Sequence, residues 1–411
     1  MWKAFRFKAI LPACRRRSSF DYMKTKFFYH ILLLMFLTAD AKAQQTSLPA
    51  RAWRVAGELP AFQAQPQALG VAGPVAGVHN DVLLVAGGAN FPEGAPWLGG
   101  KKKYYREGFV FRKDRNGVLV KTADFSLPLA VGYSANCTTP FGIVAAGGEM
   151  DAGLLSSVLL LQWNKESQAV VFSNLPPLPF AVTNAAIAFY NNKLYLAGGE
   201  RAEAVSQNFL VLDMADTSAG WNTLPSIPKP VSHAVPVVQH NGSEQALYLV
   251  GGRKRNPGGL SELSASVYAF DLIKGAWVEK APLPYALSAG TGLAAGKQSI
   301  LLFGGDTGET FHQTESLIAA IANETDESKK QSLNNEKITV QSSHPGFCKQ
   351  VLIYHTKKDK WEEAGCIPFS APVTTTAVGW NGEVILPSGE IKAGVRTPYI
   401  LSADLTGLKD L

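Results

Sequence analysis

An apolar run that closes on a Gly-Gly doublet recurs along this 411-residue chain. The copies are VLLVAGG at 82–88, GIVAAGG at 142–148, KLYLAGG at 193–199, LYLVGG at 247–252 and ILLFGG at 300–305. A sixth copy, EVILPSG at 383–389, keeps only the second glycine. The first glycines are 60, 51, 53 and 53 residues apart, with 84 more to Ser388. Repeats of about 50 residues are typical of the blades of a β-propeller. The sequence therefore predicts an all-β, six-bladed propeller.

Each repeat can be divided into four strands. An inner strand of small and β-branched residues precedes the strand that ends in Gly-Gly, a third strand such as 266–272 follows, and a fourth opens on an aromatic residue. Trp221, Trp277 and Trp361 take that last place, and we interpret them as packing between blades. Alternating strands with Gly and Pro punctuation at this spacing indicate a kelch-type propeller.

The last repeat is incomplete, and the chain begins with the missing piece. Residues 370–411 stop without an aromatic fourth strand, whereas WRVAGELP at 53–60 has the pattern of a fourth strand with nothing before it. Pairing the two segments would close the ring and remove the open sheet edges. We therefore expect the last blade to be closed by the N-terminal strand.

The fifth repeat carries a long insertion. About 45 residues separate Gly305 from Val351, and residues 314–338 favour a helix. Because structureless loops of that length are uncommon in compact domains, we expect a helical insertion at about 308–345. The sequence leaves open whether it is an ordered lid or a solvated decoration.

The first 43 residues have the pattern of a leader. Residues 30–39 are apolar but too short to span a bilayer, and Ala41-Lys42-Ala43 resembles a signal-peptidase site. Met23 opens a more ordinary signal peptide than Met1 does, so we expect translation to start there. The prediction is a periplasmic protein, free of the membrane after cleavage, with a single propeller domain at 44–411.

Charge offers no support for a nucleic-acid partner. The whole chain has a formal net charge of +6, but residues 1–43 hold nine of its 39 Lys and Arg and two of its 33 Asp and Glu. The remaining 30 basic and 31 acidic residues nearly balance. A protein that binds nucleic acid through its phosphates would need an excess of basic residues.

Cysteines and histidines suggest neither a metal site nor a nucleotide site. The seven histidines have no paired ligand spacing, and the Gly-Gly doublets lack a phosphate-binding pattern. Cys348 and Cys366 flank a predicted hairpin and would lie nearly opposite each other, which allows a disulfide or two free thiols. We expect no cofactor and no metal.

In a propeller the loops after the second strands open on one face, around the central channel. The residues just after each doublet are expected to form a ring there: Asn90, Glu149, Glu200, Arg253, Asp306 and Glu390. The loop of the sixth copy also places Arg396 six residues after Glu390, across a glycine turn. A carboxylate can exchange a proton with a sugar hydroxyl, and a guanidinium can clamp a carboxylate.

That loop resembles the catalytic loop of the bacterial N-acetylneuraminate epimerases, or sialate mutarotases, which are six-bladed kelch propellers. Their loop has the sequence N-G-E-A-K-P-G-L-R-T, and residues 388–397 here are S-G-E-I-K-A-G-V-R-T. The segments GVAGPVAGVHND at 70–81, AGGANF at 86–91 and KKKYY at 101–105 also resemble segments of that family. In the familiar members those segments follow the catalytic loop, so the chain resembles a cyclically permuted branch.

The resemblance implies a mutarotase that interconverts the α and β anomers of N-acetylneuraminate by acid/base ring opening and closure. It implies Glu390 as the proton acceptor and Arg396 as the group that holds the substrate carboxylate. Arg253, Arg201, Asn90 and the Lys101–Lys103 run are weaker candidates for substrate binding. Two alternatives remain: a mutarotase for another acidic or N-acetylated sugar, and a non-catalytic propeller that binds glycans or proteins.

Overall fold

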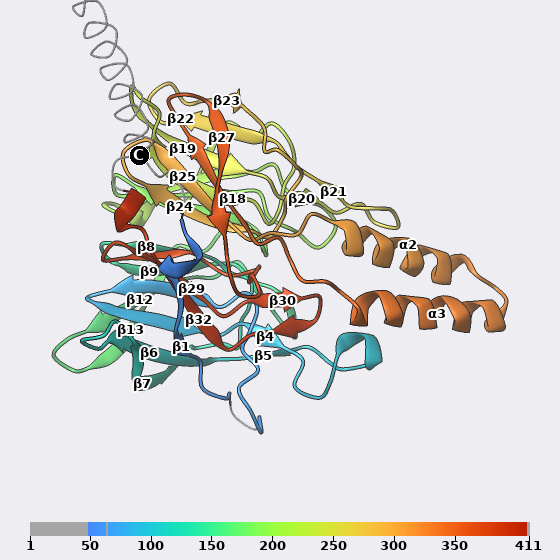
Figure 1. The fold of residues 1–411 in the computed structure, drawn as a ribbon. Coiled ribbons are helices and arrows are strands. Elements are labelled where there is room, and N and C mark those ends of the chain that lie inside the picture. Colours follow the sequence, from blue (N-terminus) through green and yellow to red (C-terminus); the bar gives the residue numbers. More distant parts are fainter. Residues whose placement is uncertain (1–47, 63–64, 409–411) are drawn as a thin grey trace, which may run out of the picture. The chain divides into compact units, whose positions relative to one another are not determined.

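The computed structural model describes residues 48–62 and 65–408. The predicted leader at 1–43 and the start at Met23 lie outside the described residues. Within the unit that runs from Thr46 to Leu411, the strands form six four-stranded antiparallel sheets arranged as the blades of a propeller (Figure 1). The six-bladed all-β fold predicted from the Gly-Gly repeats is confirmed.

The first three blades follow one another along the chain. Blade one consists of β2 (Val75–His79), β3 (Val82–Ala86), β6 (Glu107–Lys113) and β7 (Leu119–Ser126). Blade two consists of β8 (Ala135–Thr139), β9 (Gly142–Ala146), β12 (Val158–Asn164) and β13 (Ala169–Leu175). Blade three consists of β14 (Ala186–Tyr190), β15 (Lys193–Ala197), β16 (Phe209–Asp213) and β17 (Asn222–Leu224).

The second half of the ring repeats the pattern. Blade four consists of β18 (Val235–His240), β19 (Gln245–Val250), β22 (Val267–Asp271) and β23 (Ala276–Lys280). Blade five consists of β24 (Thr291–Ala295), β25 (Ser299–Phe303), β26 (Gln350–His355) and β27 (Lys360–Cys366). Blade six consists of β28 (Val378–Trp380), β29 (Glu383–Pro387), β32 (Tyr399–Asp404) and β1 (Trp53–Glu58).

The sixth blade joins the two ends of the propeller. Strand β1 pairs with β32 in antiparallel register, from Trp53 opposite Ala403 to Glu58 opposite Tyr399, with a bulge between Val55 and Gly57. The blade thus has the composition expected from the sequence, three strands from the C-terminal repeat and one from residues 53–58. The pairing covers the edge of β32, so the last blade has an outermost fourth strand like the other five.

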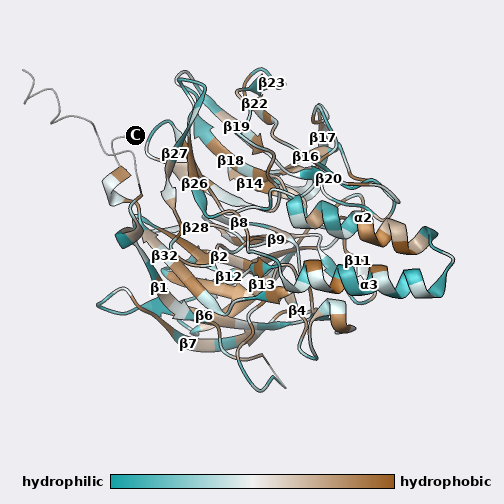
Figure 2. Ribbon diagram, turned by 45° about the vertical axis from the view of Figure 1, so that its right-hand side comes forward, coloured by the Kyte–Doolittle hydropathy of each residue, from teal (hydrophilic) through white to brown (hydrophobic). Residues whose placement is uncertain are grey.

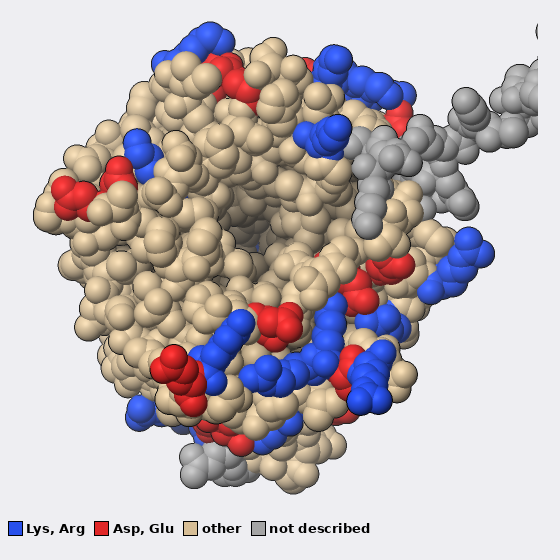
Figure 3. All heavy atoms as spheres, turned by 90° about the vertical axis from the view of Figure 1, so that its left-hand side faces the viewer, with Lys and Arg blue, Asp and Glu red and all other residues tan. Residues whose placement is uncertain are grey.

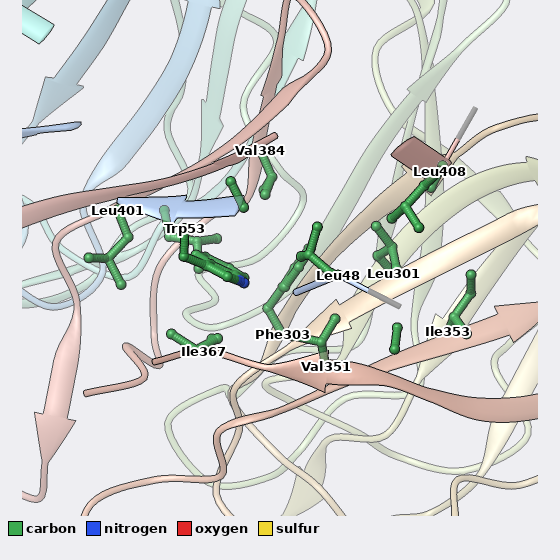
Figure 4. Close-up of a cluster of buried hydrophobic side chains, with 14 of the residues drawn as sticks. Leu48, Trp53, Leu301, Phe303, Val351, Ile353, Ile367, Val384, Leu401 and Leu408 are labelled. Atoms are coloured by element: carbon green, nitrogen blue, oxygen red, sulfur yellow. The ribbon is translucent and has the colours of Figure 1, made fainter. Parts of the chain in front are cut away.

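Apolar side chains pack between neighbouring blades. Figure 2 shows the hydrophobic residues concentrated in the strands. Between blades five and six, Trp53 meets Phe303 edge to face at 5.8 Å between ring centres, in a cluster that Figure 4 draws with Leu48, Val351 and Leu401. Fully burying one such side chain contributes about 1.5–3 kcal/mol, so the closure is held by packing as well as by strand pairing.

The tryptophans of the fourth strands connect blades, as expected. The indole N–H of Trp221 donates to the carbonyl of Pro176 at 2.8 Å, that of Trp277 to Pro225 at 2.9 Å, and that of Trp361 to Ala281 at 3.0 Å. Each acceptor lies just after the fourth strand of the preceding blade. The indole ring is half-buried and its one polar group is satisfied, which explains the recurrence of tryptophan at this place.

The insertion in blade five is a pair of helices, α2 (Glu309–Asn323) and α3 (Glu327–Ser342). The side chain of Asp326 caps α3 by accepting from the N–H groups of Ser328 and Lys329. Neither helix has a buried residue, and Figure 1 shows the pair projecting from one face of the propeller. We call it the helical hairpin. No helix in the described part of the chain is long and apolar enough to cross a membrane.

Short strand pairs extend four blades, and Figure 1 shows β4, β20 and β30 on the face that carries the helical hairpin. They are β4 (Ala89–Asn90) with β5 (Lys103–Tyr104), β10 (Glu149–Met150) with β11 (Gly153–Leu154), β20 (Arg253–Lys254) with β21 (Glu262–Leu263), and β30 (Glu390–Lys392) with β31 (Val395–Arg396). Single-turn helices occur at η2 (Ala50–Ala52), η3 (Pro96–Leu98), η4 (Thr217–Ala219) and η5 (Thr406–Leu408).

Cys348 and Cys366 are free thiols. The residue opposite Cys366 in the ladder of β26 and β27 is Gln350, two positions after Cys348. The expectation that the two cysteines lie nearly opposite each other is therefore wrong by two residues, because β26 begins later than the sequence suggested.

Candidate functional site

The residue after each doublet lies at one end of the central channel, which we call the mouth. Each of these residues forms an isolated antiparallel bridge with a residue just before an inner strand: Ala89 with Ala72, Glu149 with Gly132, Glu200 with Thr183, Arg253 with Ser232, Asp306 with Ser288, and Glu390 with Val373. Five of the six predicted ring positions are thus as expected.

The sixth position needs a correction. In blade one the ring residue is Ala89, and Asn90 is the next residue along β4. Asn90 is only 1% exposed; its amide donates to the carbonyl of Gly70 and its oxygen accepts from Tyr105. Asn90 therefore serves the packing of blade one.

Six backbone hydrogen bonds close a circle around the channel next to these residues. Each N–H donates to the carbonyl of the equivalent residue in a neighbouring blade, at 2.7–3.0 Å, and every φ is positive, between 48° and 63°. The six members, which we call the entrance ring, are Gly73, Tyr133, Asn184, His233, Ala289 and Thr374. Left-handed backbone is unusual for bulky residues, so the closure of the circle imposes it.

Glu390 and Arg396 are cross-strand partners in the ladder of β30 and β31. Arg396 Nη1 lies 3.2 Å from Glu390 Oε1, and the N–H of Gly394 donates to the same oxygen at 2.6 Å. The arginine side chain is 4% exposed and the glutamate side chain 19%. The two residues singled out in the sequence are therefore held together, with the carboxylate the more accessible of the two.

The guanidinium of Arg396 is enclosed on its other sides. Its carbon Cζ lies 4.6 Å from the ring centre of Phe91, and Nη2 donates to the hydroxyl of Tyr133 at 3.4 Å. The buried Nε and Nη1 atoms make no hydrogen bond within the described residues, so the contact of Nη1 with Glu390 is an ion pair. Buried donors without a protein partner are expected where a ligand supplies the acceptor.

Ser388 explains why the sixth doublet differs from the others. It has φ of 60°, like the first glycines of the other doublets, and is fully buried. Its hydroxyl accepts from the N–H of Val71 at 2.9 Å and lies 2.7 Å from the carbonyl of Thr397. The serine thus ties the loop that carries Glu390 to the start of blade one, offsetting the cost of a left-handed residue with a side chain.

Gly394 brings the same loop under the η3 segment of blade one. Its φ is 76°, and a Cβ there would lie 2.6 Å from Pro96 and 2.9 Å from Trp97. Only glycine allows this approach together with the hydrogen bond to Glu390. Residues from blades six and one therefore build this side of the mouth jointly.

Tyr133 and Lys102 complete a cluster that no sequence motif indicates. The Lys102 ammonium lies 5.1 Å from the ring centre of Tyr133 and 3.0 Å from Glu149, which also accepts from the hydroxyl of Tyr104 at 2.6 Å. Burial lowers the pKa of Lys102, but Tyr133 and Glu149 together raise it by more, so the net shift of this pKa is upward. Burial also raises the pKa of Tyr104, with Glu149 adding to it.

Tyr133 was missed because its position carries a different residue in every repeat. Superposing the repeats on the residue two positions before the inner strand would have found it, since that residue belongs to the entrance ring in blades one to five. Burial raises the pKa of Tyr133, whereas Arg396 and Lys102 lower it and Glu390 raises it. The tyrosine is therefore electrostatically coupled to both residues predicted from the loop.

A second group of charges lies across the mouth. Arg253 Nη2 is 3.3 Å from Glu200 Oε1, and Nδ1 of His233 is 3.5 Å from the same oxygen. The guanidinium of Arg253 also packs 5.0 Å from the ring centre of Phe311 in α2. Burial holds the pKa of His233 well below its ordinary value, and Arg253 lowers it further, so this imidazole is neutral at pH 7.

Arg201 and the end of the insertion take different places. Arg201 is exposed and stacks on Phe180 at 4.7 Å, in the loop that leads to blade three. His344, just after α3, is buried and accepts the N–H of Gly346 at Nδ1. Burial lowers its pKa, while Asp306 and Glu390 raise it and Lys392 lowers it. The insertion therefore brings a histidine toward Glu390.

The channel beyond the entrance ring has another character. A cavity of about 350 Å³ follows the inner strands, lined by the ring and by small uncharged residues such as Ala135, Ala188 and Thr375, with no Asp, Glu, Lys or Arg among its lining residues. Figure 3 views the face opposite the helical hairpin, where the channel opens as a hollow. Cys137 lines the wall, and burial raises its pKa to about 12, which leaves the thiol neutral. The candidate chemistry is confined to the mouth.

Comparison with known proteins gives the same family as the loop. The family model described as N-acetylneuraminate epimerase matches residues 175–409, more than half of the chain. The chain is similar to the N-acetylneuraminate epimerases of Salmonella typhimurium, at 27% identity over 233 residues, and of Yersinia enterocolitica, at 28% over 238 residues. Each match covers 56% of this chain and 58% of the relative, so the chain spans little more than half the length of these relatives.

The similar protein of Haemophilus influenzae gives a comparable result. It carries the same name and is 25% identical over 231 residues, which is 54% of this chain and 57% of the relative. The matched region of the family model includes Glu390 and Arg396. Lys102 and Tyr133 precede its first residue, 175.

Proposed function

The chain belongs to the N-acetylneuraminate epimerase family, and on that basis we propose that it is a mutarotase that interconverts the α and β anomers of N-acetylneuraminate. The observation that carries the proposal is the fixed carboxylate of Glu390 at the mouth. Its Oε1 is held by the Gly394 N–H and by Arg396, in a loop anchored through Ser388. An acid/base group needs this kind of positioning more than it needs strength.

The reaction requires two proton transfers in each direction. A base removes the proton of the anomeric hydroxyl while an acid protonates the ring oxygen, and the ring carbon–oxygen bond breaks to give the open-chain ketone. The keto acid rotates about its carbon–carbon bond and closes again with the opposite anomer. Glu390 takes the base role, and the scheme requires no cofactor. A positioned acid/base group typically accelerates such a step by about 10²–10⁴-fold.

Arg396 has two tasks in the proposal. It orients Glu390 and Tyr133 through the contacts at 3.2 and 3.4 Å, and its unbonded Nε and Nη1 hydrogens are left for an oxygen of the substrate carboxylate. Lys102 and Arg253, on either side of the mouth, add positive potential for an anionic sugar. Their own carboxylate partners, Glu149 and Glu200, keep them in place.

We propose in addition that the protein acts in the periplasm and belongs to a cyclically permuted branch. The apolar stretch at 30–39 with its following cleavage pattern motivates the first proposal. The second draws support from a family match limited to residues 175–409 and from the contribution of residues 53–58 to the last blade.

The test is anomer exchange followed by NMR on α-N-acetylneuraminate freshly released by a sialidase. We expect the wild-type protein to speed the approach to equilibrium and Glu390→Gln to lose about 10²-fold or more of that rate. Glu327→Gln is the matched control, because its side chain is 87% exposed on α3. A Glu390→Gln protein with full activity would remove Glu390 as the base.

The same assay separates the alternatives. Acceleration with a uronic acid or with N-acetylmannosamine, but not with N-acetylneuraminate, would assign the mutarotase to another sugar. Saturable binding of N-acetylneuraminate without any acceleration by the wild-type protein would identify a binding propeller.

A further inference from the structure

Tyr133 reaches the mouth because two features of the fold place it there. As a member of the entrance ring it has φ of 57°, and its N–H and carbonyl bond to Gly73 and Asn184 of the neighbouring blades. Gly73 lacks a side chain, and a Cβ at that position would lie 2.6 Å from Cδ1 of Tyr133. The glycine of blade one therefore makes room for the tyrosine ring of blade two.

The contacts of the hydroxyl group decide what it can do. Arg396 Nη2 donates to the Tyr133 oxygen at 3.4 Å, so the phenol acts as the acceptor in that contact and its own proton is left for another partner. The same guanidinium contacts Glu390 through Nη1. Glu390 and Tyr133 thus contact the two terminal nitrogens of one guanidinium, and such a pair can act on two oxygens of one sugar.

The charges around Tyr133 suit a phenol that is protonated at rest and releases its proton during the reaction. Burial keeps the phenol protonated at neutral pH by raising its pKa, with Glu390 acting in the same direction. Arg396 and the ammonium of Lys102, 5.1 Å from the ring centre, stabilise the phenolate when it forms. No other member of the entrance ring has these two cations beside it within the described residues.

We propose that Tyr133 is the second acid/base group of the reaction, donating its hydroxyl proton to the ring oxygen of the sugar and recovering it on closure. The inference rests on the proposed mutarotase function. On opening, Glu390 accepts the anomeric hydroxyl proton, Tyr133 delivers its proton to the ring oxygen, and the bond from that oxygen to the anomeric carbon breaks. On closure the new hydroxyl returns its proton to the Tyr133 phenolate and attacks the ketone, whose oxygen takes the proton back from Glu390.

His344 is the rival group because it too lies close enough to Glu390 to be affected by its charge. Its Nδ1 accepts from the Gly346 N–H, so only Nε2 could donate, and burial lowers its pKa. It follows the helical hairpin directly, and no contact with Arg396 connects it to the other members of the cluster within the described residues. The experiment must therefore compare the two residues.

The central measurement is Tyr133→Phe in the NMR assay of N-acetylneuraminate exchange. We expect kcat to fall at least about tenfold with KM changed by less than about twofold, because the ring stays and only the hydroxyl is removed. Tyr285→Phe is the control. It also removes a partly buried tyrosine hydroxyl, which donates to the side chain of Gln350 in blade five. His344→Gln should keep most of the activity.

A second variant guards against a purely structural effect. Replacing Tyr133 by 3,5-difluorotyrosine keeps the ring and the hydroxyl but makes the phenol more acidic, so the alkaline limb of kcat should move to lower pH. A merely structural tyrosine would leave that limb in place. An unshifted limb, or a Tyr133→Phe protein with wild-type kcat, overturns the inference.

The outcomes also distinguish the inference from the function on which it rests. Wild-type activity lost on Glu390→Gln but kept on Tyr133→Phe, with a loss on His344→Gln, would leave the mutarotase in place and assign the acid to His344. A wild-type protein without any effect on the exchange would reject the proposed function and this inference together.

Discussion

Nη1 of Arg396 lies 3.2 Å from Oε1 of Glu390, directly across the ladder of β30 and β31 in which the two residues are partners. Glu390 and Arg396 are six residues apart in the sequence, and they lie side by side because the chain turns at Gly394. The arginine is more deeply buried than the carboxylate. Its first effect is therefore on Glu390 and Tyr133, and the substrate meets it only together with them.

Arg396→Lys is expected to lower kcat by at least about tenfold and to raise KM as well, because the guanidinium both orients Glu390 and binds the substrate carboxylate. A lysine keeps one positive charge but cannot contact Glu390 and Tyr133 through two nitrogens at once. The measurement is the steady-state rate of N-acetylneuraminate exchange over a range of concentrations. A rise in KM with unchanged kcat would show instead that Arg396 serves only to hold the substrate.

Gly394→Ala is expected to reduce kcat/KM by about tenfold or more. The new methyl group would lie 2.6 Å from Pro96, and the shift that relieves this clash moves the N–H that holds Glu390. Gly258→Ala is the matched control, because Gly258 also has positive φ, 73°, but its Cβ would meet no atom within 4 Å. Equal activities of the two variants would contradict a special role for the Gly394 turn.

The helical hairpin is expected to affect substrate binding without supporting the fold. Neither helix has a buried residue, and Phe311 meets Arg253 at the mouth. Phe311→Ala should raise KM while thermal unfolding shifts by no more than about 2 °C, the effect of a change of roughly 0.5 kcal/mol. Ile318→Ala, on the exposed part of the same helix, is the control. A large loss of thermal stability in the Phe311 variant would show that the hairpin holds the propeller together.

His233 is expected to make the fold less stable in mild acid. Its pKa is held well below the ordinary value by burial and by Arg253, so the unfolded chain takes up a proton near pH 6.5 that the folded chain refuses. The contribution is fully present above that pH and is lost as the pH falls below it. Between pH 7.5 and 5.0 the loss amounts to up to about 2 kcal/mol of unfolding free energy.

His233→Asn removes this titration with little strain, since Asn184 occupies the equivalent ring position with φ of 52°. Urea unfolding at the two pH values should show a smaller difference for the variant than for the wild type. His79 and His344, whose pKa values burial also lowers, account for the part that remains. An unchanged difference would mean that His233 is not the group responsible.

The repeat architecture could be predicted from the sequence because it is written in local patterns. Alternating strands, Gly-Gly punctuation near every fiftieth residue and aromatic fourth strands are properties of single segments. The closure by residues 53–58 also followed, because a strand without a predecessor and a repeat without a fourth strand match each other. The insertion was recognised by length and composition.

The pair Glu390 and Arg396 was also within reach of the sequence, since both lie in one short loop. In blade one the residue directly after the doublet is Ala89, so the prediction of Asn90 was displaced by one residue. The expected alignment of Cys348 with Cys366 was also displaced, by two residues, because a shift in register changes which residues lie opposite each other.

Local sequence patterns were enough to give the number of blades, the strand that closes them and the loop that carries Glu390 and Arg396. The residues that surround that loop became known only once the chain was folded. Tyr133 of blade two, Lys102 of blade one and Arg396 of blade six are far apart in the chain, and they meet because a closed ring of hydrogen-bonded blades brings equivalent positions to one circle. No local pattern records such a meeting, because it depends on the ring closing.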